Sequence, residues 1–582
     1  SGTNNFIKSN LSYIKGDLYY AANPDTDSNA NKIIDFVRGI DVFDENLNGK
    51  TNDERWKLGD IYHSQIAIVG PPSAHSTSTN TYTESYYRQS NQYDNFKQAN
   101  KNRKTFILAG ANDGMLHAFD SLTGDEIWAF IPPSVIPNLR NMVSSKANSS
   151  NSIYAVDGSP VVKDIYYDNK WRTVVIAGLG RGGHSYFALD ITDIDNPKHL
   201  FTFDNDPSLK IIQYWNSDGL KDRFAYNSSI PSEYDFSKLG ETWSTPRILR
   251  IRINSKDKWV AVFGAGFNNG VNTNYGNAVY VIDLEDGGKI LKKIDVTDKS
   301  GNNVVNSVPV SVVPVTADGT SLANYYGAIA YFADYENKLW KLNLTEQGTL
   351  YSLQELFDGE STSTNGRRAM HDVTASIDTD SKLWLYYGTG DQQQLQKESS
   401  DIKNRLYGLK DVDFPNYNDS ATKFTVAQCR DVTASSANCP TNSEKGWYIN
   451  LDANEKTTGQ ATLYNRTVYF PRYIPNKSNP CNPGEANITT HDYKCGNSLS
   501  KIKLGAGVAS SPVIYKGSIY VGLSGATNSS SSSGSNTGGS TGGNVGSQLP
   551  QGWTIKDNLV VGTPPSGRGS GQITVESWRH VF

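Results

Sequence analysis

The sequence predicts an all-β fold, and more narrowly a seven-bladed β-propeller with long loop insertions. The first observation is a short β-run ending at a small residue, which recurs seven times along the 582 residues. The second is composition: 51 Gly, 33 Tyr and an aromatic share of 11% suit short strands joined by tight turns. The third is the order of the runs along the chain, because most copies of the recurring run are preceded and followed by further β-runs of similar kind. Sequential sheets of this kind indicate a radial fold that hides their edges.

Each repeat is expected to be a four-stranded antiparallel meander. The recurring runs are residues 106–110, 174–178, 260–264, 329–333, 383–388, 467–470 and 519–522. Most follow an earlier run, often opened by Pro, at residues 63–69, 159–162, 245–249, 308–312, 373–377 and 511–514. Most precede a run that ends in an acid or amide, at residues 116–120, 186–190, 278–283, 339–343 and 405–411. A fourth strand follows a turn, as in residues 122–130, and residues 572–578 are expected to complete the last blade.

Three segments lie outside the repeat. Residues 1–60 are expected to form an N-terminal extension packed on the propeller, which itself spans residues 61–582. Residues 76–104 are polar, with a short surface helix predicted within 93–104. Residues 527–549 are rich in Ser and Gly with almost nothing apolar, so a flexible insertion in the last blade is expected there.

Charge and hydropathy exclude two classes of partner. Lys plus Arg is 55 and Asp plus Glu is 59, giving a net charge of −4, so no basic excess is present to bind nucleic acid. No apolar run reaches the roughly 18 to 20 residues of a membrane helix, so no transmembrane segment is predicted in this chain.

The four cysteines suggest an oxidising compartment. Cys429 lies near Cys439, and Cys481 lies near Cys495, without zinc-ligand spacing. The simplest interpretation is two local disulfides, Cys429–Cys439 and Cys481–Cys495, which predict an extracytoplasmic protein. Four reduced, unrelated thiols are the alternative.

The sharpest local signal for a bound ion is the loop of residues 44–54. Oxygen-bearing side chains occupy loop positions 1, 3 and 5, Gly49 occupies position 6, and further oxygen donors follow. This pattern indicates Ca²⁺, which takes six to eight oxygen ligands around a sharp turn. The candidate ligands are Asp44, Asn46, Asn48, the Lys50 carbonyl, Asn52 and Asp53. Position 12 is Arg55 instead of Glu, so the loop is not a regular EF-hand, and a solvated Asn/Gly turn is the alternative.

Other motifs point to turns and not to chemistry. Residues 178–184, GLGRGGH, resemble a phosphate loop, but a strand follows them where a helix is needed. Asp378 to Asp380 is interpreted as a hairpin turn. No H-E-x-x-H motif occurs, no G-x-S-x-G nucleophile elbow appears, and no catalytic residue is predicted.

Several stretches together resemble the C-terminal domain of the PilC/PilY family of type IV pilus biogenesis and tip adhesin proteins. The most specific is GANDGMLHAFD at residues 110–120, continuing to IWAFIP at 127–132. Residues 55–64, 387–390, 406–408 and 577–579 also fit. The resemblance covers the chain from about residue 38 to its end.

The resemblance implies a modified, quinoprotein-like seven-bladed propeller and a protein without catalysis. It implies a protein of the pilus tip, cell surface or outer membrane that promotes pilus extension and twitching motility, antagonises retraction and binds host cells. Its expected partners are pilins or minor pilins and a host-cell receptor. The family commonly carries a D-x-D-x-D-G-x-x-D calcium loop, whose counterpart here, residues 316–324, keeps only Asp318. The loop of residues 44–54 is therefore the better calcium candidate.

Two other functions compete with the adhesin. Residues 120–128 look like the tryptophan-docking repeat of quinoprotein dehydrogenases, but only one good copy is present and adjacent cysteines are missing. A periplasmic assembly scaffold is the third interpretation. Bound quinone would favour the dehydrogenase.

Overall fold

The structure is a computed structural model with side chains. It describes residues 5–18, 27–143, 150–270, 274–296, 304–420, 422–434, 436–476, 483–524, 549, 552–556 and 558–563. The predicted insertion at 527–549, apart from residue 549, and the predicted strand at 572–578 lie outside the described residues. No helix in these ranges is long and apolar enough to cross a membrane.

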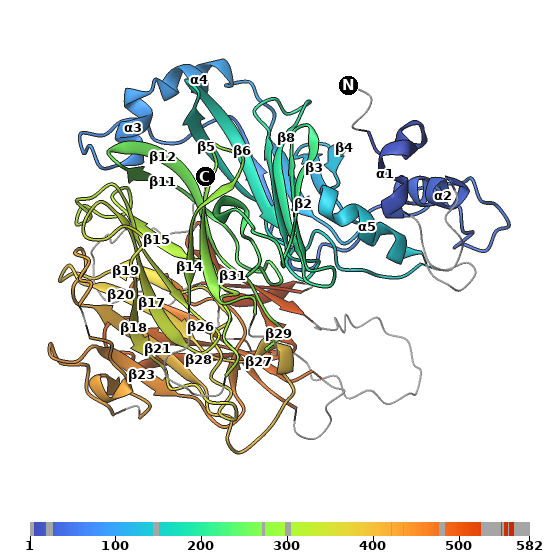
Figure 1. Cartoon of the computed structure of the whole chain (residues 1–582). Helices are drawn as coiled ribbons and strands as arrows, with labels where there is room; N and C mark the ends of the chain where they lie inside the picture. The colour runs from blue at the N-terminus through green and yellow to red at the C-terminus, as the bar shows by residue number, and fades with distance from the viewer. Residues whose placement is uncertain are drawn as a thin grey trace, which may run out of the picture. The chain divides into compact units, whose positions relative to one another are not determined.

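Among the described residues the strands form seven sheets, and these are the seven blades of a β-propeller. The chain divides into two compact units, with residues 1–250 and 255–296 in the first and residues 251–254 and 297–581 in the second. Figure 1 shows the strands as arrows coloured along the chain. Three sheets belong to the first unit, apart from the end of β11, and four belong to the second.

The sheets of the first unit follow chain order. The first has the order β1-β2-β3-β4 and comprises β1 (Ala67–Val69), β2 (Phe106–Gly110), β3 (Leu116–Asp120) and β4 (Glu126–Phe130). The second has the order β10-β9-β8-β7-β6-β5 and comprises β5 (Val161–Tyr167), β6 (Lys170–Gly178), β7 (Ser185–Asp190), β8 (Lys198–Asp206), β9 (Ile211–Asn216) and β10 (Gly219–Ala225). The third has the order β11-β12-β13-β14 and comprises β11 (Arg247–Ile253), β12 (Lys256–Gly264), β13 (Ala278–Asp283) and β14 (Lys289–Asp295).

The second unit continues the series with its fourth and fifth sheets. The fourth comprises β15 (Val313–Thr316), β16 (Gly327–Ala333), β17 (Lys338–Thr345) and β18 (Leu353–Asp358). The fifth has the order β19-β20-β21-β23-β22 and comprises β19 (Thr374–Ile377), β20 (Leu383–Gly388), β21 (Arg405–Asp411), β22 (Arg430–Asp431) and β23 (Gly446–Asn450).

The sixth and seventh sheets are the last two sheets of the second unit among the described residues. The sixth comprises β24 (Lys456–Thr457), β25 (Thr462–Tyr464), β26 (Thr467–Ile474), β27 (Glu485–Asp492) and β28 (Ser498–Ala506). The seventh comprises β29 (Val508–Ala509), β30 (Val513–Tyr515), β31 (Ser518–Ser524), β32 (Trp553–Lys556) and β33 (Leu559–Gly562).

The helices are short and lie outside the sheets. The α-helices are α1 (Leu11–Leu18), α2 (Asp27–Val37), α3 (Glu84–Ser90), α4 (Tyr93–Ala99) and α5 (Ile136–Leu139). Single 3₁₀ turns occur at η2 (Lys8–Asn10), η3 (Pro133–Val135), η4 (Arg140–Met142), η5 (Ser232–Tyr234), η6 (Gln392–Gln394) and η7 (Val426–Gln428). Helix α3 begins where the Thr83 side chain accepts the Tyr86 amide, a standard N-cap.

The hydrophobic cores lie between consecutive sheets within each unit. In the first unit, Phe106 and Leu116 share a buried cluster with Val175 and Phe187 of the second sheet, and Ile33 of α2 joins it. In the second unit, Trp384 and Trp447 of the fifth sheet are buried with Phe470 and other residues of the sixth. Apolar burial between neighbouring sheets is what stabilises each such pair.

Every one of the seven recurring runs falls in the second or an equivalent inner strand of its sheet, so the repeat is confirmed. Two expectations were wrong in detail. The strand expected at residues 308–312 begins only at Val313, because the preceding stretch makes a single bridge at Val308. The uniform meander also fails, since the second sheet adds the β9–β10 hairpin and β22 pairs with β23 in parallel.

Candidate functional site

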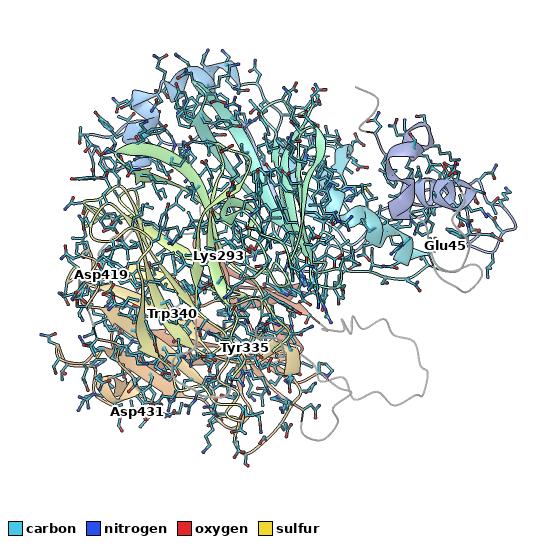
Figure 2. All side chains as sticks on the ribbon, in the orientation of Figure 1. Glu45, Lys293, Tyr335, Trp340, Asp419 and Asp431 are labelled. Carbon is cyan, nitrogen blue, oxygen red and sulfur yellow. A yellow bond between two sulfur atoms is a disulfide. The ribbon has the colours of Figure 1, made fainter. Side chains whose placement is uncertain are left out.

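The predicted calcium loop projects from the end of α2 and is closed at its base by backbone pairing. Asp41 N donates to Asp53 O at 2.9 Å, and Arg55 N donates to Gly39 O at 3.0 Å. An ion pair between Arg55 Nε and Glu45 Oε2, 2.8 Å apart, adds a side-chain clasp. Glu45 is labelled in Figure 2. The loop is therefore held at both ends before any ion binds.

Inside the loop, Asp44 organises the turn. Its carboxylate accepts the amides of Asn48, at 2.9 Å, and of Gly49, at 3.1 Å. Asp44 has a φ of 53° and Gly49 a φ of 78°, both in the left-handed region that Asp tolerates and Gly favours. These contacts fix the backbone in a tight curl around one carboxylate.

Asp53, on the other arm of the loop, also has Asn48 as a hydrogen-bond partner. Its Oδ2 accepts from Asn48 Nδ2 at 2.6 Å and from Asn46 Nδ2 at 3.3 Å. These hydrogen bonds, that of Asn48 first, lower the pKa of the Asp53 carboxyl, which is therefore ionised. Its other oxygen, Oδ1, is shielded from water and has no hydrogen-bond partner among the described residues. An ionised carboxylate with such an oxygen suits a bound cation.

The loop brings together two carboxylates and two side-chain amides. Four of the predicted ligands, Asp44, Asn46, Asn48 and Asp53, are linked by these hydrogen bonds. A half-turn of the Asn46 and Asn48 side-chain amides would exchange the positions of their nitrogen and oxygen atoms. Only two of the four carry charge, which weakens affinity. Among the described residues no cluster of three or more His, Cys, Asp and Glu is arranged for a metal. Any ion here therefore relies on amide and backbone oxygens such as the Lys50 carbonyl.

Residues 316–324, the stretch that the resemblance pairs with a calcium loop, lie between β15 and β16 apart from Thr316, which ends β15. Residues 316–324 form two successive turns, closed by Gly319 N to Thr316 O and by Ala323 N to Thr320 O. Asp318 is the one carboxylate in that stretch. The loop of residues 44–54 thus offers more acidic donors than residues 316–324.

The cysteine pairing predicted from spacing is wrong. Cys439 bonds to Cys495, 56 residues away, with their Cα atoms 4.3 Å apart. Cys429 is a free, buried thiol whose pKa is raised by burial to about 12. Cys481 lies outside the described residues. The physical reason is a tertiary contact, because the β27–β28 turn of the sixth sheet meets the loop before β23 of the fifth. The spacing of cysteines along the sequence does not reveal which distant segments meet in this way.

The motif at residues 110–120, on which the resemblance rests, connects the β2–β3 turn to residues 59–60 by hydrogen bonds. Asp113 accepts the Gly59 amide at 2.8 Å, and Asn112 Nδ2 donates to Asp60 at 2.9 Å. A Cβ at Gly59 would lie 2.5 Å from the Asp113 nitrogen, so only Gly fits. The motif fastens residues 59–60 to the β2–β3 turn, which is a structural task.

His117, in the same motif, is a buried charged group. Burial opposes its protonation, but hydrogen bonds to Asp113 and Glu126, both at 3.1 Å, outweigh burial and raise its pKa to about 9. The imidazole is therefore a cation between two carboxylates at neutral pH. With both nitrogens occupied, it has no proton acceptor to offer a substrate.

The glycine-rich stretch at 178–184 is a packed turn, as predicted. It joins β6 to β7, and a Cβ at Gly182 would come within 1.8 Å of the Ala155 oxygen. Asp378 likewise closes the β19–β20 hairpin by accepting the Asp380 amide at 2.8 Å. Neither stretch forms a ligand cradle.

Sequence reasoning missed a polar groove between α3–α4 and the β5–β6 hairpin. Its walls come from segments about 70 residues apart, and α3 carried no periodic signal in a polar stretch. The abundance of Asn and Gln around residues 89–100 was the one available hint.

The seven sheets, which follow one another along the chain, place it among the β-propeller proteins. The family model described as the PilY1 beta-propeller domain matches residues 58–386. The chain belongs to this family of type IV pilus biogenesis factors.

Curated relatives carry the same name. The type IV pilus biogenesis factor PilY1 of Pseudomonas aeruginosa is 32% identical over 353 residues, covering 59% of this chain and 26% of the relative. A PilY1 homolog of Xylella fastidiosa is 26% identical over 499 residues, covering 78% of this chain and 30% of the relative. The chain thus spans between a quarter and a third of these relatives.

A solved structure agrees with the fold. The crystal structure of the Pseudomonas aeruginosa PilY1 C-terminal domain superimposes with a TM-score of 0.52 at 21% identity, covering 79% of this chain and 98% of that one. At this identity the likeness supports the fold alone.

Proposed function

We propose that this chain is the propeller part of a protein that promotes type IV pilus extension and twitching motility and adheres to host cells. The observation that supports the proposal is the family match over residues 58–386, together with relatives named as pilus biogenesis factors. The proposed partners are pilins or minor pilins and a host-cell surface receptor. The proposed location is extracytoplasmic, at the pilus tip, cell surface or outer membrane, where a disulfide such as Cys439–Cys495 persists.

The proposed role is binding and assembly without catalysis. The charged groups around His117 are saturated by one another, which supports a structural role for the family motif. The competing dehydrogenase predicts a bound quinone, so an absorbance spectrum of the purified protein tests it. A quinone band that resists dialysis would overturn the non-catalytic role.

Ca²⁺ bound at Asp44, Asn46, Asn48, Lys50, Asn52 and Asp53 is proposed to tune this function. The support is the shielded Asp53 Oδ1 and the shared partner Asn48, whose backbone amide donates to Asp44 and whose side-chain amide donates to Asp53. When bound, the ion would neutralise the two carboxylates and stiffen the loop.

Deleting the gene in its own bacterium tests the pilus role. We expect fewer surface pili and a smaller twitching zone, both restored by the full-length gene. Because the protein is proposed to antagonise retraction, pili should also return to the deletion strain when retraction is blocked. Normal piliation and motility in the deletion strain would contradict the proposal.

A further inference from the structure

An open groove of about 510 Å³ lies within the first unit, between the α3–α4 segment and the β5–β6 hairpin. Figure 1 shows α3 and α4, in blue, beside β5. Small-molecule sites typically measure roughly 300–1,000 Å³. Of the eleven lining residues, five are Asn or Gln and two are Ser or Thr.

Several of these polar groups have no partner within the described part of the chain. Asn95 donates to Gln92 Oε1 at 3.1 Å, which leaves Asn95 Oδ1 and Gln92 Nε2 without a hydrogen bond there. The Asn169 amide, at the tip of the hairpin, makes no side-chain hydrogen bond in the same ranges. Gln92, Asn95 and Asn169 are exposed, so their amides offer acceptor oxygens and donor hydrogens to solvent and to a ligand alike. The groove therefore presents both kinds of hydrogen-bonding group on opposite walls.

Aromatic rings form the apolar part of the groove. Trp171 and Tyr166 have ring centroids 5.3 Å apart, and Phe96 of α4 also lines the groove. Trp171 is 8% exposed and belongs to the core, so the rings open to a ligand are the half-buried Tyr166 and Phe96. A ligand that combines apolar C–H groups with hydroxyls, such as a sugar, matches this lining of rings and amides.

The groove is nearly free of charge. Lys170 is its single charged lining residue, and none is acidic. A nucleotide, a sialylated glycan or an acidic peptide would find one exposed cation, which contributes little in water. The lining thus favours an uncharged ligand.

The walls are fixed in advance by buried contacts. Trp171 Nε1 donates to Asn91 O at 2.8 Å, and Tyr93 donates to Asp164 of β5. Beneath α3, the Glu84 carboxylate pairs with Arg88 at 2.8 Å and with Lys163 of β5 at 2.7 Å. A preformed site loses less conformational entropy when it binds a ligand.

From these observations we infer that the groove binds a neutral oligosaccharide, with Asn95 and Asn169 contacting its hydroxyls from opposite walls. This inference deepens the adhesive half of the proposed function and rests on it. The pilus-assembly half does not depend on it.

Saturation-transfer NMR with chitotriose, cellotriose and lacto-N-tetraose tests the inference on the purified chain. The test variant is Asn95→Ala with Asn169→Gly, since Gly accepts the φ of 58° at residue 169. The matched control is Gln98→Ala, exposed on the same helix but outside the groove. Thermal unfolding confirms that all three proteins are folded.

We expect at least one probe to bind wild type and the control equally, and to bind the double variant about tenfold more weakly or worse, because two sets of hydrogen bonds are lost. No binding of any probe, or equal binding by the double variant, overturns the inference. Binding of sialyllactose or a heparin oligosaccharide in place of the neutral probes also overturns it. Piliation and twitching of the same double variant separate the two failures: normal pili with no sugar binding would refute the groove and leave the pilus function standing.

Discussion

Two added segments of this molecule are fastened to their sheets in different ways. The α3–α4 segment is held by ion pairs and by aromatic packing. Glu84 forms ion pairs with Arg88 and Lys163. The ring centroids of Tyr87 and Trp259 are 5.9 Å apart. The loop before β23 is held by the Cys439–Cys495 bond. The first fastening depends on the ionisation of buried groups and the second on the redox state. One chain therefore combines two kinds of anchor that fail under different conditions.

The largest effect is expected from removing the buried carboxylate. Glu84→Ala leaves Arg88 and Lys163 as buried cations with one fewer partner, and should lower the free energy of unfolding by about 3–5 kcal/mol. Urea denaturation followed by tryptophan fluorescence measures it. Glu54→Ala, at a side chain 85% exposed, should change the free energy by less than about 0.5 kcal/mol. Equal small effects in both variants would show that the charges do not anchor α3.

The disulfide should have the next largest effect. Cys439→Ser with Cys495→Ser is expected to lower the free energy of unfolding by about 2–4 kcal/mol, because the unfolded chain gains the freedom of a 56-residue loop. A reductant should destabilise wild type to a similar extent and leave the double variant unchanged. Peptide mapping that found Cys439 bonded to Cys429 would contradict the pairing.

A third joint extends the charge-based anchor to the first sheet, and its effect depends on pH. The pKa of His117 is raised from 6.5 to about 9 in the folded protein, so its stabilisation is complete below pH 6.5 and is lost as pH rises through 9. We expect a loss of about 2 kcal/mol across that window, discounted because Glu126 is half exposed. Unfolding curves from pH 6 to 10 measure it. His117→Gln should remove this slope, and His75→Gln, at an exposed site, should keep it.

The smallest effect on stability is expected from substitutions in the loop of residues 44–54 that leave its Arg55–Glu45 ion pair intact. Asp44→Asn with Asp53→Asn keeps the shape and removes both charges, so the calcium-free protein should lose less than about 1 kcal/mol. Titration calorimetry on chelator-stripped protein should show calcium binding to wild type and none to the variant. Asp218→Ala, in an exposed hairpin turn, is the control. Equal heat of calcium binding in all three proteins would show that the ion binds at another loop.

The fold was predictable because its signal is repeated. Each inner strand, such as Val174–Gly178 or Val260–Gly264, is an apolar run bounded by turns, and seven copies outweigh an error in any one. The misplaced strand at 308–312 shows the limit, since an apolar, Pro-containing run there makes only a single bridge, at Val308, before β15 begins at Val313.

The site was only partly predictable. The order of oxygen donors from Asp44 to Asp53 is local, so the sequence displays it and the structure brings Asp44, Asn46, Asn48 and Asp53 together. The Cys439–Cys495 bond and the groove between Asn95 and Asn169 are contacts between distant segments. A single sequence records neither, because the residues involved carry no periodicity that depends on their partners.

The outer hairpin of the second sheet has a consequence for how the molecule behaves in a crowded solution. Among the described strands, β10 lies at the edge of this sheet. It carries Lys221, Asp222 and Arg223 and a register shift between Leu220 and Asp222. Charges and an irregular edge discourage a second molecule from adding its own strand. Replacing Lys221 and Arg223 by Thr is expected to promote concentration-dependent self-association, which light scattering would detect. This edge strand belongs to neither the predicted calcium loop nor the groove.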